Sequence, residues 1–311
     1  KRIALDTSEQ ALPAAVVEVH PLRLGAGGRP ADAATGEWVA EEVPIALEFN
    51  GLSHAVMLAT PLDLEDFALG FALSEGIVSS ADELRDLEVR PAACQAPGSP
   101  PAWEVHIELS PRRLDGLKQR RRTLAGRTGC GVCGIESLQA LELLPPPLPA
   151  ADWLERVDAA LLARVMPQLQ DFQPLNAQAG AVHVAAWAEL DGRLRWARED
   201  VGRHNALDKL IGVLARQDRL GVPGLVLMSS RASHELVAKC ARVGLQALAT
   251  VSAPTALGVQ AAQAAEVFGS RALIWLKSAA ISFRPFGAQI MPRIALATAC
   301  MGGPIRASML S

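Results

Sequence analysis

Short apolar segments alternate with helical segments in the second half of the chain, and this alternation limits the possible folds more than any other feature. Residues 225–228 read Leu-Val-Leu-Met, and residues 247–251 read Ala-Leu-Ala-Thr-Val. Helical patterns surround them at 204–215, 233–245 and 255–268. Continuous apolar strands are typical of a sheet that is buried on both faces, and strands that are separated by helices commonly run parallel. We therefore predict an α/β fold with an at least partly parallel sheet.

The first part of the chain shows a different pattern. Two apolar runs at 43–49 and 53–58 flank the dipeptide Asn50-Gly51. This dipeptide favours the two-residue turn of a β-hairpin, so we expect the two runs to pair as antiparallel strands. Further strands are predicted at 84–90 and 103–109. These elements indicate a small α+β domain.

Helix starts and a proline-rich stretch set the predicted domain boundaries. Asp63 is expected to cap a helix that continues to about residue 74, and Asp152 is expected to cap one that continues to residue 165. Residues 145–149 read Pro-Pro-Pro-Leu-Pro, which is typical of a stiff linker. We predict a small N-terminal α+β domain at 1–125, a cysteine loop and linker at 126–150, and a larger α/β domain at 151–311.

Cys130 and Cys133 lie two residues apart in the stretch 127–134, Arg-Thr-Gly-Cys-Gly-Val-Cys-Gly. Arg127 and the arginines at 120–122 place positive charge nearby, which favours the nucleophilic thiolate. Four interpretations are open from the spacing alone: half of a zinc site, a dithiol redox pair, a cysteine that carries a persulfide, and a turn without function. The scattered remaining cysteines disfavour zinc, and the flanking glycines disfavour a redox motif that opens a helix.

Composition excludes several classes of function. The net charge of −3 provides no global basic field, so we expect no nucleic-acid partner. Five cysteines in 311 residues do not resemble a disulfide framework, and reduced thiols favour a cytoplasmic protein. No apolar run reaches the ~18 residues of a membrane-spanning helix, so we expect no membrane partner.

Polar residues follow three of the predicted strands, where open α/β sheets bind ligands. The three stretches are 198–209, 229–234 and 252–255, and each enters a predicted helix. Arginine side chains and the free N–H groups of helix starts suit an anionic ligand, and aspartates suit a guanine edge or ribose hydroxyls. The candidate binding residues are Arg198, Asp200, Arg203, His204, Asp208, Arg231, Ser252 and Thr255.

Taken together, these stretches resemble the formate dehydrogenase accessory sulfurtransferase family, the FdhD/NarQ family. Residues 198–212, Arg-Glu-Asp-Val-Gly-Arg-His-Asn-Ala-Leu-Asp-Lys-Leu-Ile-Gly, match its signature, and residues 127–134 match its cysteine loop. Residues 42–76 and two stretches at 230–246 and 251–255 also match. The resemblance covers roughly residues 40 to 268.

The resemblance implies a specific role. Members take sulfane sulfur from a cysteine desulfurase, hold it as a persulfide, and pass it to the molybdenum cofactor of formate dehydrogenase in its bis-guanine-dinucleotide form. By position, Cys130 would be the persulfide carrier and Cys133 its partner. A homodimer and a cytidine-deaminase-like fold for the larger domain are also implied. The alternative function is a non-catalytic chaperone that binds the same cofactor, which needs the 198–209 stretch but not Cys130.

The chain departs from related patterns in three places. A zinc deaminase needs His-x-Glu or Cys-x-Glu followed by Pro-Cys-x-x-Cys, and Gly129 stands in place of that proline, so we expect neither deamination nor a bound metal. Ala179-Gly180-Ala181-Val182-His183 replaces the family's Thr-Gly-Gly-x-His. Residues 278–311 match no family ending, so we expect a loosely packed tail that contributes little to binding. Trp275 and Lys277 are candidates to replace the family's aromatic and basic cofactor-binding residues.

Overall fold

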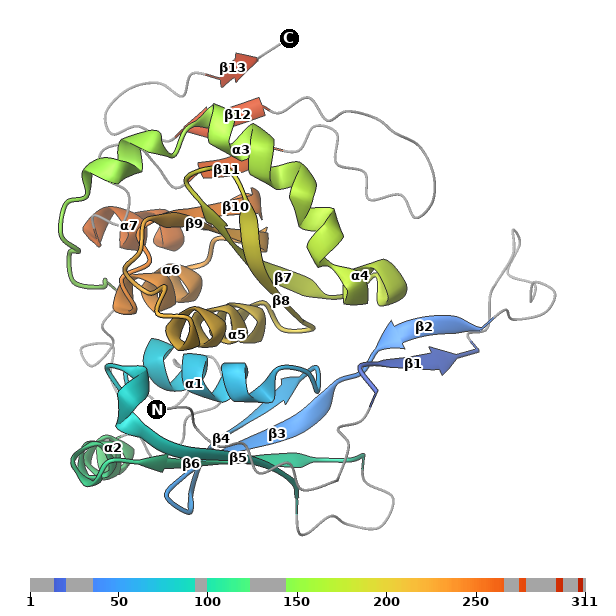
Figure 1. Ribbon diagram of the computed structural model, residues 1–311, viewed down its shortest axis with the longest axis vertical. Helices are drawn as coiled ribbons and strands as arrows, with labels where there is room; N and C mark the ends of the chain where they lie inside the picture. Colours follow the sequence, from blue (N-terminus) through green and yellow to red (C-terminus); the bar gives the residue numbers. More distant parts are fainter. Residues whose placement is uncertain are drawn as a thin grey trace.

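The computed structural model describes residues 14–20, 36–92, 100–123 and 144–265, and the backbone of three further strands. Figure 1 shows two sheets separated by helices. We call residues 43–123 the N-terminal unit, and residues 151–265 with the three further strands the C-terminal unit. The predicted cysteine loop, with Cys130 and Cys133, lies outside the described residues.

The N-terminal unit contains one four-stranded sheet in the order β4-β3-β6-β5. Its strands are β3 (Val43–Phe49), β4 (Leu52–Ala59), β5 (Leu84–Pro91) and β6 (Trp103–Leu109). β3 and β4 pair antiparallel, as predicted from Asn50-Gly51, and both turn residues have positive φ. β3 pairs parallel with β6, so this sheet is mixed. The four strands predicted from the sequence are confirmed.

Helix α1 (Leu64–Ser74) covers this sheet and is buried along nearly its whole length. Most of its side chains are apolar because the sheet lies against one side and the C-terminal unit lies against the other. Asp63 is the residue before the helix, but its φ of 52° is left-handed and its side chain makes no capping hydrogen bond. The predicted capping role of Asp63 is therefore wrong. Its carboxylate instead lies 3.5 Å from the guanidinium of Arg198.

The C-terminal unit contains a seven-stranded sheet in the order β13-β12-β11-β10-β9-β7-β8. Its strands are β7 (His183–Glu189), β8 (Leu194–Asp200), β9 (Gly224–Arg231), β10 (Leu248–Ser252), β11 (Ile274–Lys277), β12 (Ala295–Thr298) and β13 (Ala307–Met309). β9, β10 and β11 run parallel, whereas the other pairs are antiparallel. The predicted partly parallel sheet is confirmed. The tail, which we expected to be loosely packed, contributes two short strands.

Helices lie on both sides of the second sheet (Figure 1). Those in the C-terminal unit are α3 (Ala159–Val165), α4 (Pro174–Ala179), α5 (Arg203–Arg216), α6 (His234–Arg242) and α7 (Ala256–Ala264), with 3-10 helices at Asp152–Arg156 and Met166–Phe172. Asp152 begins a 3-10 helix without a capping bond, so the predicted cap is wrong. Asp158 caps α3 instead, because its carboxylate accepts a hydrogen bond from the N–H of Leu161 at 2.7 Å.

The two units meet where α1 crosses α5, between the two sheets (Figure 1). Both helices have a glycine at the crossing. A Cβ on Gly70 would lie 1.7 Å from the carbonyl oxygen of Asp208, and one on Gly212 would lie 1.9 Å from that of Asp66. Only glycine permits this backbone approach. The order of layers is therefore sheet, α1, α5, sheet.

Two further elements lie outside these layers. β1 (Val16–Val19) and β2 (Glu37–Ala40) form an antiparallel arm that contacts α4, and α2 (Pro111–Thr123) follows β6. Among the described helices, none has the length and apolar character needed to cross a membrane.

Candidate ligand-binding site

The carboxyl ends of β8, β9 and β10 lie at one edge of the second sheet, in which β7 separates β8 from β9. Asp200 ends β8, Arg231 ends β9 and Ser252 ends β10. Arg231 and Ser252 are partners in the β9–β10 register, and Asp200 is opposite His183 at the start of β7. We call this row the strand-end edge. The sequence prediction that each of the three stretches lies at the end of a strand is confirmed.

Two arginines at this edge make no ion pair with any described residue. Arg203 is the first residue of α5, and Arg231 is exposed at the end of β9. Other arginines of this unit, such as Arg195 and Arg198, are held by carboxylates. An unpaired guanidinium beside helix N-termini favours an anionic ligand, because guanidinium forks match phosphate oxygens and helix starts offer N–H donors.

His204 and Glu235 join the starts of α5 and α6 beside these arginines. His204 Nε2 lies 2.6 Å from Glu235 Oε2. The hydrogen bond from His204 lowers the pKa of Glu235, and the charge of Arg203 lowers it further. Glu235 was not among the sequence candidates, although its position at the predicted start of a helix after a strand was a signal for it.

His183 lies in the same region, where β7 begins. Its Nδ1 is 3.3 Å from the hydroxyl of Ser229, which also accepts the N–H of Val184 at 3.0 Å. Burial lowers the pKa of His183, and the charges of Arg203 and His204 lower it further. The neutral imidazole is therefore favoured, and it can accept or donate one hydrogen bond at this edge.

Thr255 and Ser252 lie at the third strand end. Thr255 caps α7, because its hydroxyl accepts the N–H of Gly258 at 3.0 Å. Ser252 is exposed. Trp275 pairs with Thr250 in the β10–β11 register, so β11 continues the row, and Lys277 is its last residue. For Trp275 and Lys277 the structure describes only the backbone.

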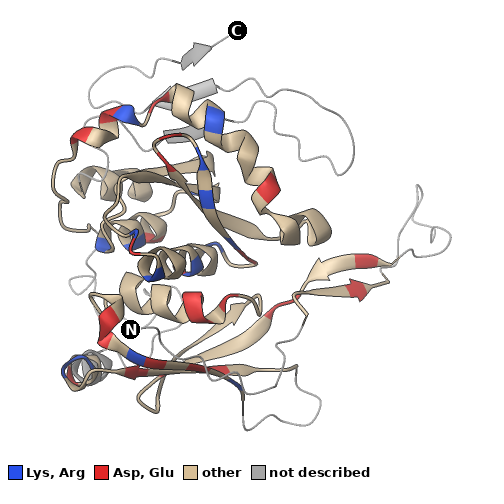
Figure 2. Ribbon diagram, in the orientation of Figure 1, with Lys and Arg blue, Asp and Glu red and all other residues tan. Residues whose placement is uncertain are grey.

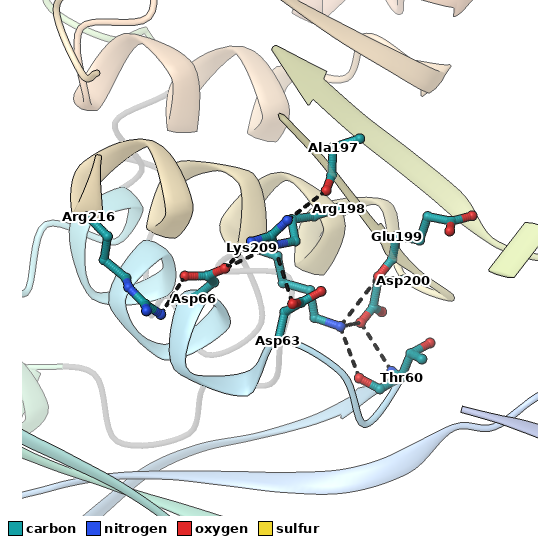
Figure 3. Close-up of polar contacts among 9 residues, drawn as sticks. All are labelled: Thr60, Asp63, Asp66, Ala197, Arg198, Glu199, Asp200, Lys209 and Arg216. Atoms are coloured by element: carbon teal, nitrogen blue, oxygen red, sulfur yellow. Dashed lines mark hydrogen bonds and ion pairs between the residues drawn. The ribbon is translucent and has the colours of Figure 1, made fainter. Parts of the chain in front are cut away.

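Asp200 has a different setting from the arginines, because it is fully buried between the two units. Figure 3 shows its carboxylate facing Lys209 and Thr60. Its Oδ2 lies 2.6 Å from Lys209 Nζ and accepts the N–H of Thr60 at 3.1 Å. Its Oδ1 accepts from the N–H of Gly202 at 2.8 Å and from Asn205 Nδ2 at 3.0 Å. Both oxygens are therefore occupied by protein donors.

Asp208 is buried in a second cluster of the same kind. The hydroxyl of Ser74 donates to its Oδ1 at 2.6 Å, and Lys239 Nζ lies 2.9 Å from both oxygens. Lys239 also pairs with Glu75 at 2.8 Å. Burial raises the pKa of Asp208, while attraction to Lys239 opposes that change. The predicted ligand contacts of Asp200 and Asp208 stay predictions. In the structure both carboxylates are held by a lysine of their own unit and by one residue of the N-terminal unit, Thr60 or Ser74.

Arg198 also contacts the N-terminal unit. Its Nε and Nη2 donate to Asp66 Oδ2 at 2.9 and 2.6 Å, and Arg216 donates to Asp66 Oδ1 at 3.0 Å (Figure 3). Figure 2 shows the same arrangement at the scale of the chain, with acidic residues on α1 opposite basic residues on α5. The charged residues of 198–216 are thus divided between the strand-end edge and the contact between units.

The remaining residues to place are the cysteines and possible metal ligands. Cys130 and Cys133 lie outside the described residues. Cys240 is buried in α6, and burial raises its pKa to about 12, so its thiolate is disfavoured. In the described ranges, no group of three or more His, Cys, Asp or Glu residues is arranged to hold a metal ion.

Comparison with known proteins bears on this site directly. Residues 40–268 match the FdhD/NarQ family, a span that contains both the cysteine loop and the strand-end edge. The chain belongs to the FdhD/NarQ family. This membership was expected from the signature at 198–212 and from the cysteine loop.

Two curated relatives in the family are named "Sulfur carrier protein FdhD". The protein of Chromobacterium violaceum is 50% identical over 264 residues, which cover 84% of this chain and 92% of the relative. The protein of Burkholderia cenocepacia is 51% identical over 231 residues, which cover 74% of this chain and 81% of the relative.

A solved structure of similar fold comes from Desulfotalea psychrophila, assigned as a formate dehydrogenase accessory protein. It matches with a TM-score of 0.55 and 21% sequence identity, covering 85% of this chain and 92% of that chain. This likeness supports the mixed α/β fold. The signature at 198–212 contains Asp200, Asp208 and Gly212. In this structure all three contact the N-terminal unit.

Proposed function

We propose that the protein carries sulfane sulfur as a persulfide on Cys130, from a cysteine desulfurase to the molybdenum cofactor that formate dehydrogenase requires. The observation that carries this proposal is the family match over residues 40–268, in which one span joins the cysteine loop to the strand-end edge. The relatives' name, sulfur carrier protein, supports the sulfur chemistry. The name of the solved relative supports formate dehydrogenase as the client.

The loading step of this proposal is an exchange between a thiolate and a persulfide. The Cys130 thiolate attacks the terminal sulfur of the desulfurase persulfide. A sulfur–sulfur bond forms at Cys130, the bond on the desulfurase breaks, and the desulfurase cysteine leaves as a thiolate with the electron pair. No external oxidant or reductant is needed. The arginines at 120–122 and at 127 favour the Cys130 thiolate on which the step depends.

Cys133 is proposed to assist release. Its thiolate attacks Cys130 Sγ, a disulfide forms between the two cysteines, and the terminal sulfur leaves as hydrosulfide to the acceptor. A cellular dithiol then reduces the disulfide and restores both thiols. The spacing of two residues between the cysteines is compatible with such a pair.

The strand-end edge is proposed to bind the guanine-nucleotide part of the cofactor, which is cargo in this reaction. The side chains of Arg203 and Arg231, which make no ion pair with a described residue, suit its phosphates. His204, Ser252 and Thr255 lie at the same edge, and β11 brings Trp275 and Lys277 to it. Asp200 and Asp208 are not included in the proposed contacts, because their carboxylates are occupied by protein donors.

Three broader features belong to the same proposal. The larger domain would have the cytidine-deaminase-like arrangement, the protein would form a homodimer, and it would work in the cytoplasm. The family resemblance supports the first two, and the odd cysteine count supports the third.

Sulfur uptake tests the carrier role. The protein is incubated with a cysteine desulfurase and cysteine, and its intact mass is measured. The wild type should gain one sulfur, and Cys130→Ala should gain none. Cys240→Ala is the matched control, because Cys240 is buried with a raised pKa and should not matter for uptake. A sulfur adduct that persists in Cys130→Ala would contradict the proposal. GDP binding without uptake in the wild type would favour the chaperone function instead.

A further inference from the structure

We infer that Thr60, a residue of the N-terminal unit, is a positioning residue for the strand-end edge of the C-terminal unit. It fixes the turn from Asp200 to Arg203, which carries the side chains proposed to bind the guanine nucleotide. The inference rests on the proposed function, because the ligand is the one proposed there. Thr60 itself is fully buried, so it is not exposed to a ligand at the edge.

The turn is closed from the inside by Asp200. β8 ends at Asp200 and α5 begins at Arg203, so two residues connect the strand to the helix. The carboxylate of Asp200 accepts the N–H of Gly202 and the side-chain amide of Asn205. Asn205 Nδ2 also donates to the carbonyl of Leu58 at 2.8 Å, so the turn is connected to β4 as well. The position of Arg203 therefore depends on this carboxylate.

Thr60 holds the same turn from the other unit with three different atoms, and Figure 3 shows its contacts with Asp200 and Lys209. Its N–H donates to Asp200 Oδ2 at 3.1 Å, and its hydroxyl oxygen accepts the N–H of Val201 at 3.2 Å. Its carbonyl accepts from Lys209 Nζ at 2.9 Å, and the same Nζ pairs with Asp200. Thr60, Asp200 and Lys209 are all fully buried. One residue thus fixes the backbone of the turn, the carboxylate inside it and the lysine that neutralises that carboxylate.

The consequence concerns ligand affinity. Arg203 and His204 follow Val201 by two and three residues, and His204 must reach Glu235 on α6. A ligand that contacts Arg203 and the first N–H groups of α5 binds more tightly when the turn is already fixed, because less conformational entropy is lost on binding. Thr60 would act through this preorganisation and not through contact with the ligand.

The alternative is that Thr60 only joins the two units. Ser74 provides the comparison, because it is also a buried hydroxyl of the N-terminal unit that binds an aspartate of α5. Its Oγ donates to Asp208 at 2.6 Å and lies 2.8 Å from Lys239 Nζ. Asp208 lies in the body of α5, and the Ser74 hydroxyl contacts Phe71, Asp208 and Lys239 rather than the 200–203 turn. A role limited to joining the units would make Thr60 and Ser74 equivalent.

The experiment compares Thr60→Val, Thr60→Ser and Ser74→Ala in the full chain. Valine has nearly the same shape as threonine but cannot accept the N–H of Val201. GDP affinity is measured by calorimetry well below the unfolding temperature of every variant, and hydrogen exchange is measured for the peptide that spans the turn. We expect Thr60→Val to weaken GDP binding about fivefold, the effect of one lost hydrogen bond, and to speed exchange at Val201 and Gly202. Thr60→Ser, which keeps the hydroxyl, should have the GDP affinity and the exchange rates of the wild type. Ser74→Ala should be less stable but should also keep the wild-type affinity and exchange rates.

Other outcomes would overturn the inference. One is that Thr60→Val binds GDP and protects the turn from hydrogen exchange as well as the wild type does. Another is that Ser74→Ala loses as much GDP affinity as Thr60→Val. If Thr60→Val does not fold, Asn205→Ala removes a bond to the same carboxylate and carries the same test. Arg203→Ala separates the two proposals. If Arg203→Ala binds GDP as tightly as the wild type, the proposed nucleotide site is wrong, and so is the role of Thr60. If Arg203→Ala loses affinity but Thr60→Val does not, only the positioning role of Thr60 is wrong.

Discussion

The arginines of β8 and α5 differ in partners, although they are alike in type. Arg198 and Arg216 share the carboxylate of Asp66, whereas Arg203 makes no ion pair with a described residue. A paired arginine at a partly buried site holds structure together, and an unpaired one beside helix starts is available to an anion. This difference selects Arg203 and Arg231 as the candidates for phosphate contacts.

Arg203→Ala should weaken GDP binding by about 10- to 100-fold, because a hydrogen bond to a charged group contributes about 1.5–3 kcal/mol. Calorimetry with GDP measures the effect. Arg195→Ala is the matched control, because Arg195 lies near the opposite end of β8 in an exposed pair with Glu189. Equal affinity in the wild type and Arg203→Ala would show that Arg203 has no part in nucleotide binding.

At the scale of elements, α1 and α5 form the contact on which the two units depend. α1 is buried along nearly its whole length, whereas a surface helix buries only one face. Gly70 and Gly212 allow the two backbones to touch, and this approach brings Ser74 and Asp66 within reach of the α5 side chains. The glycine that ends the family signature is thus explained by packing.

Gly212→Ala should destabilise the protein by at least about 2 kcal/mol. Alanine favours a helix over glycine by up to about 1 kcal/mol, but a Cβ at 1.9 Å from the backbone oxygen of Asp66 must push the helices apart. Urea unfolding measures the change. Gly116→Ala in α2 is the matched control, because nothing lies within 4 Å of its Cβ position, and it should be neutral or slightly stabilising. A Gly212→Ala variant as stable as Gly116→Ala would mean that the crossing is not close-packed.

At the scale of the whole molecule, two buried charge clusters lie where the two units meet. One contains Asp200, Lys209 and Thr60, and the other contains Asp208, Lys239 and Glu75. Removing one partner from a buried pair commonly costs about 3–5 kcal/mol, because the other charge is left without compensation. Each cluster therefore makes the contact between the units sensitive to the loss of a single charged side chain.

The Glu75–Lys239 pair predicts a dependence of stability on pH. Burial alone would raise the pKa of Glu75, but attraction to Lys239 and Arg242 outweighs it, so the pKa lies below the ordinary 4.5. A lowered folded-state pKa stabilises the fold above about pH 4.5, and this stabilisation is lost as the pH falls through the lowered value. The difference in unfolding free energy between wild type and Glu75→Gln should therefore be constant near neutral pH and shrink below about pH 4.5.

Unfolding curves at a series of pH values provide that measurement. The difference between the two proteins is needed because the pKa of Asp208 is raised and has the opposite pH dependence. Glu83→Gln is the control, since Glu83 pairs with Arg113 near the surface of one unit and should give a smaller difference at every pH. A wild-type advantage over Glu75→Gln that persists unchanged at pH 3 would contradict the lowered pKa.

Local patterns in the sequence were sufficient to predict most of the strands and helices. Asn50-Gly51 specified the β3–β4 hairpin because few residues adopt its turn, and apolar runs located β9 and β10 because strands that are buried on both faces need them. The strand-end edge followed from the alternation of strands and helices. Helix starts were less certain, because Asp63 and Asp152 have the right side chain for a cap but not the backbone geometry.

Only the tertiary structure decided what the charged residues of the signature do. Asp200 and Asp208 have the same chemistry as exposed ligand-binding aspartates, and nothing local shows that Lys209 and Lys239 lie against them under a second unit. The partners Thr60, Asp66 and Ser74 are more than 130 residues away in the chain. A sequence determines residue types and local conformation directly, whereas burial and pairing of charges depend on which distant segments fold against each other.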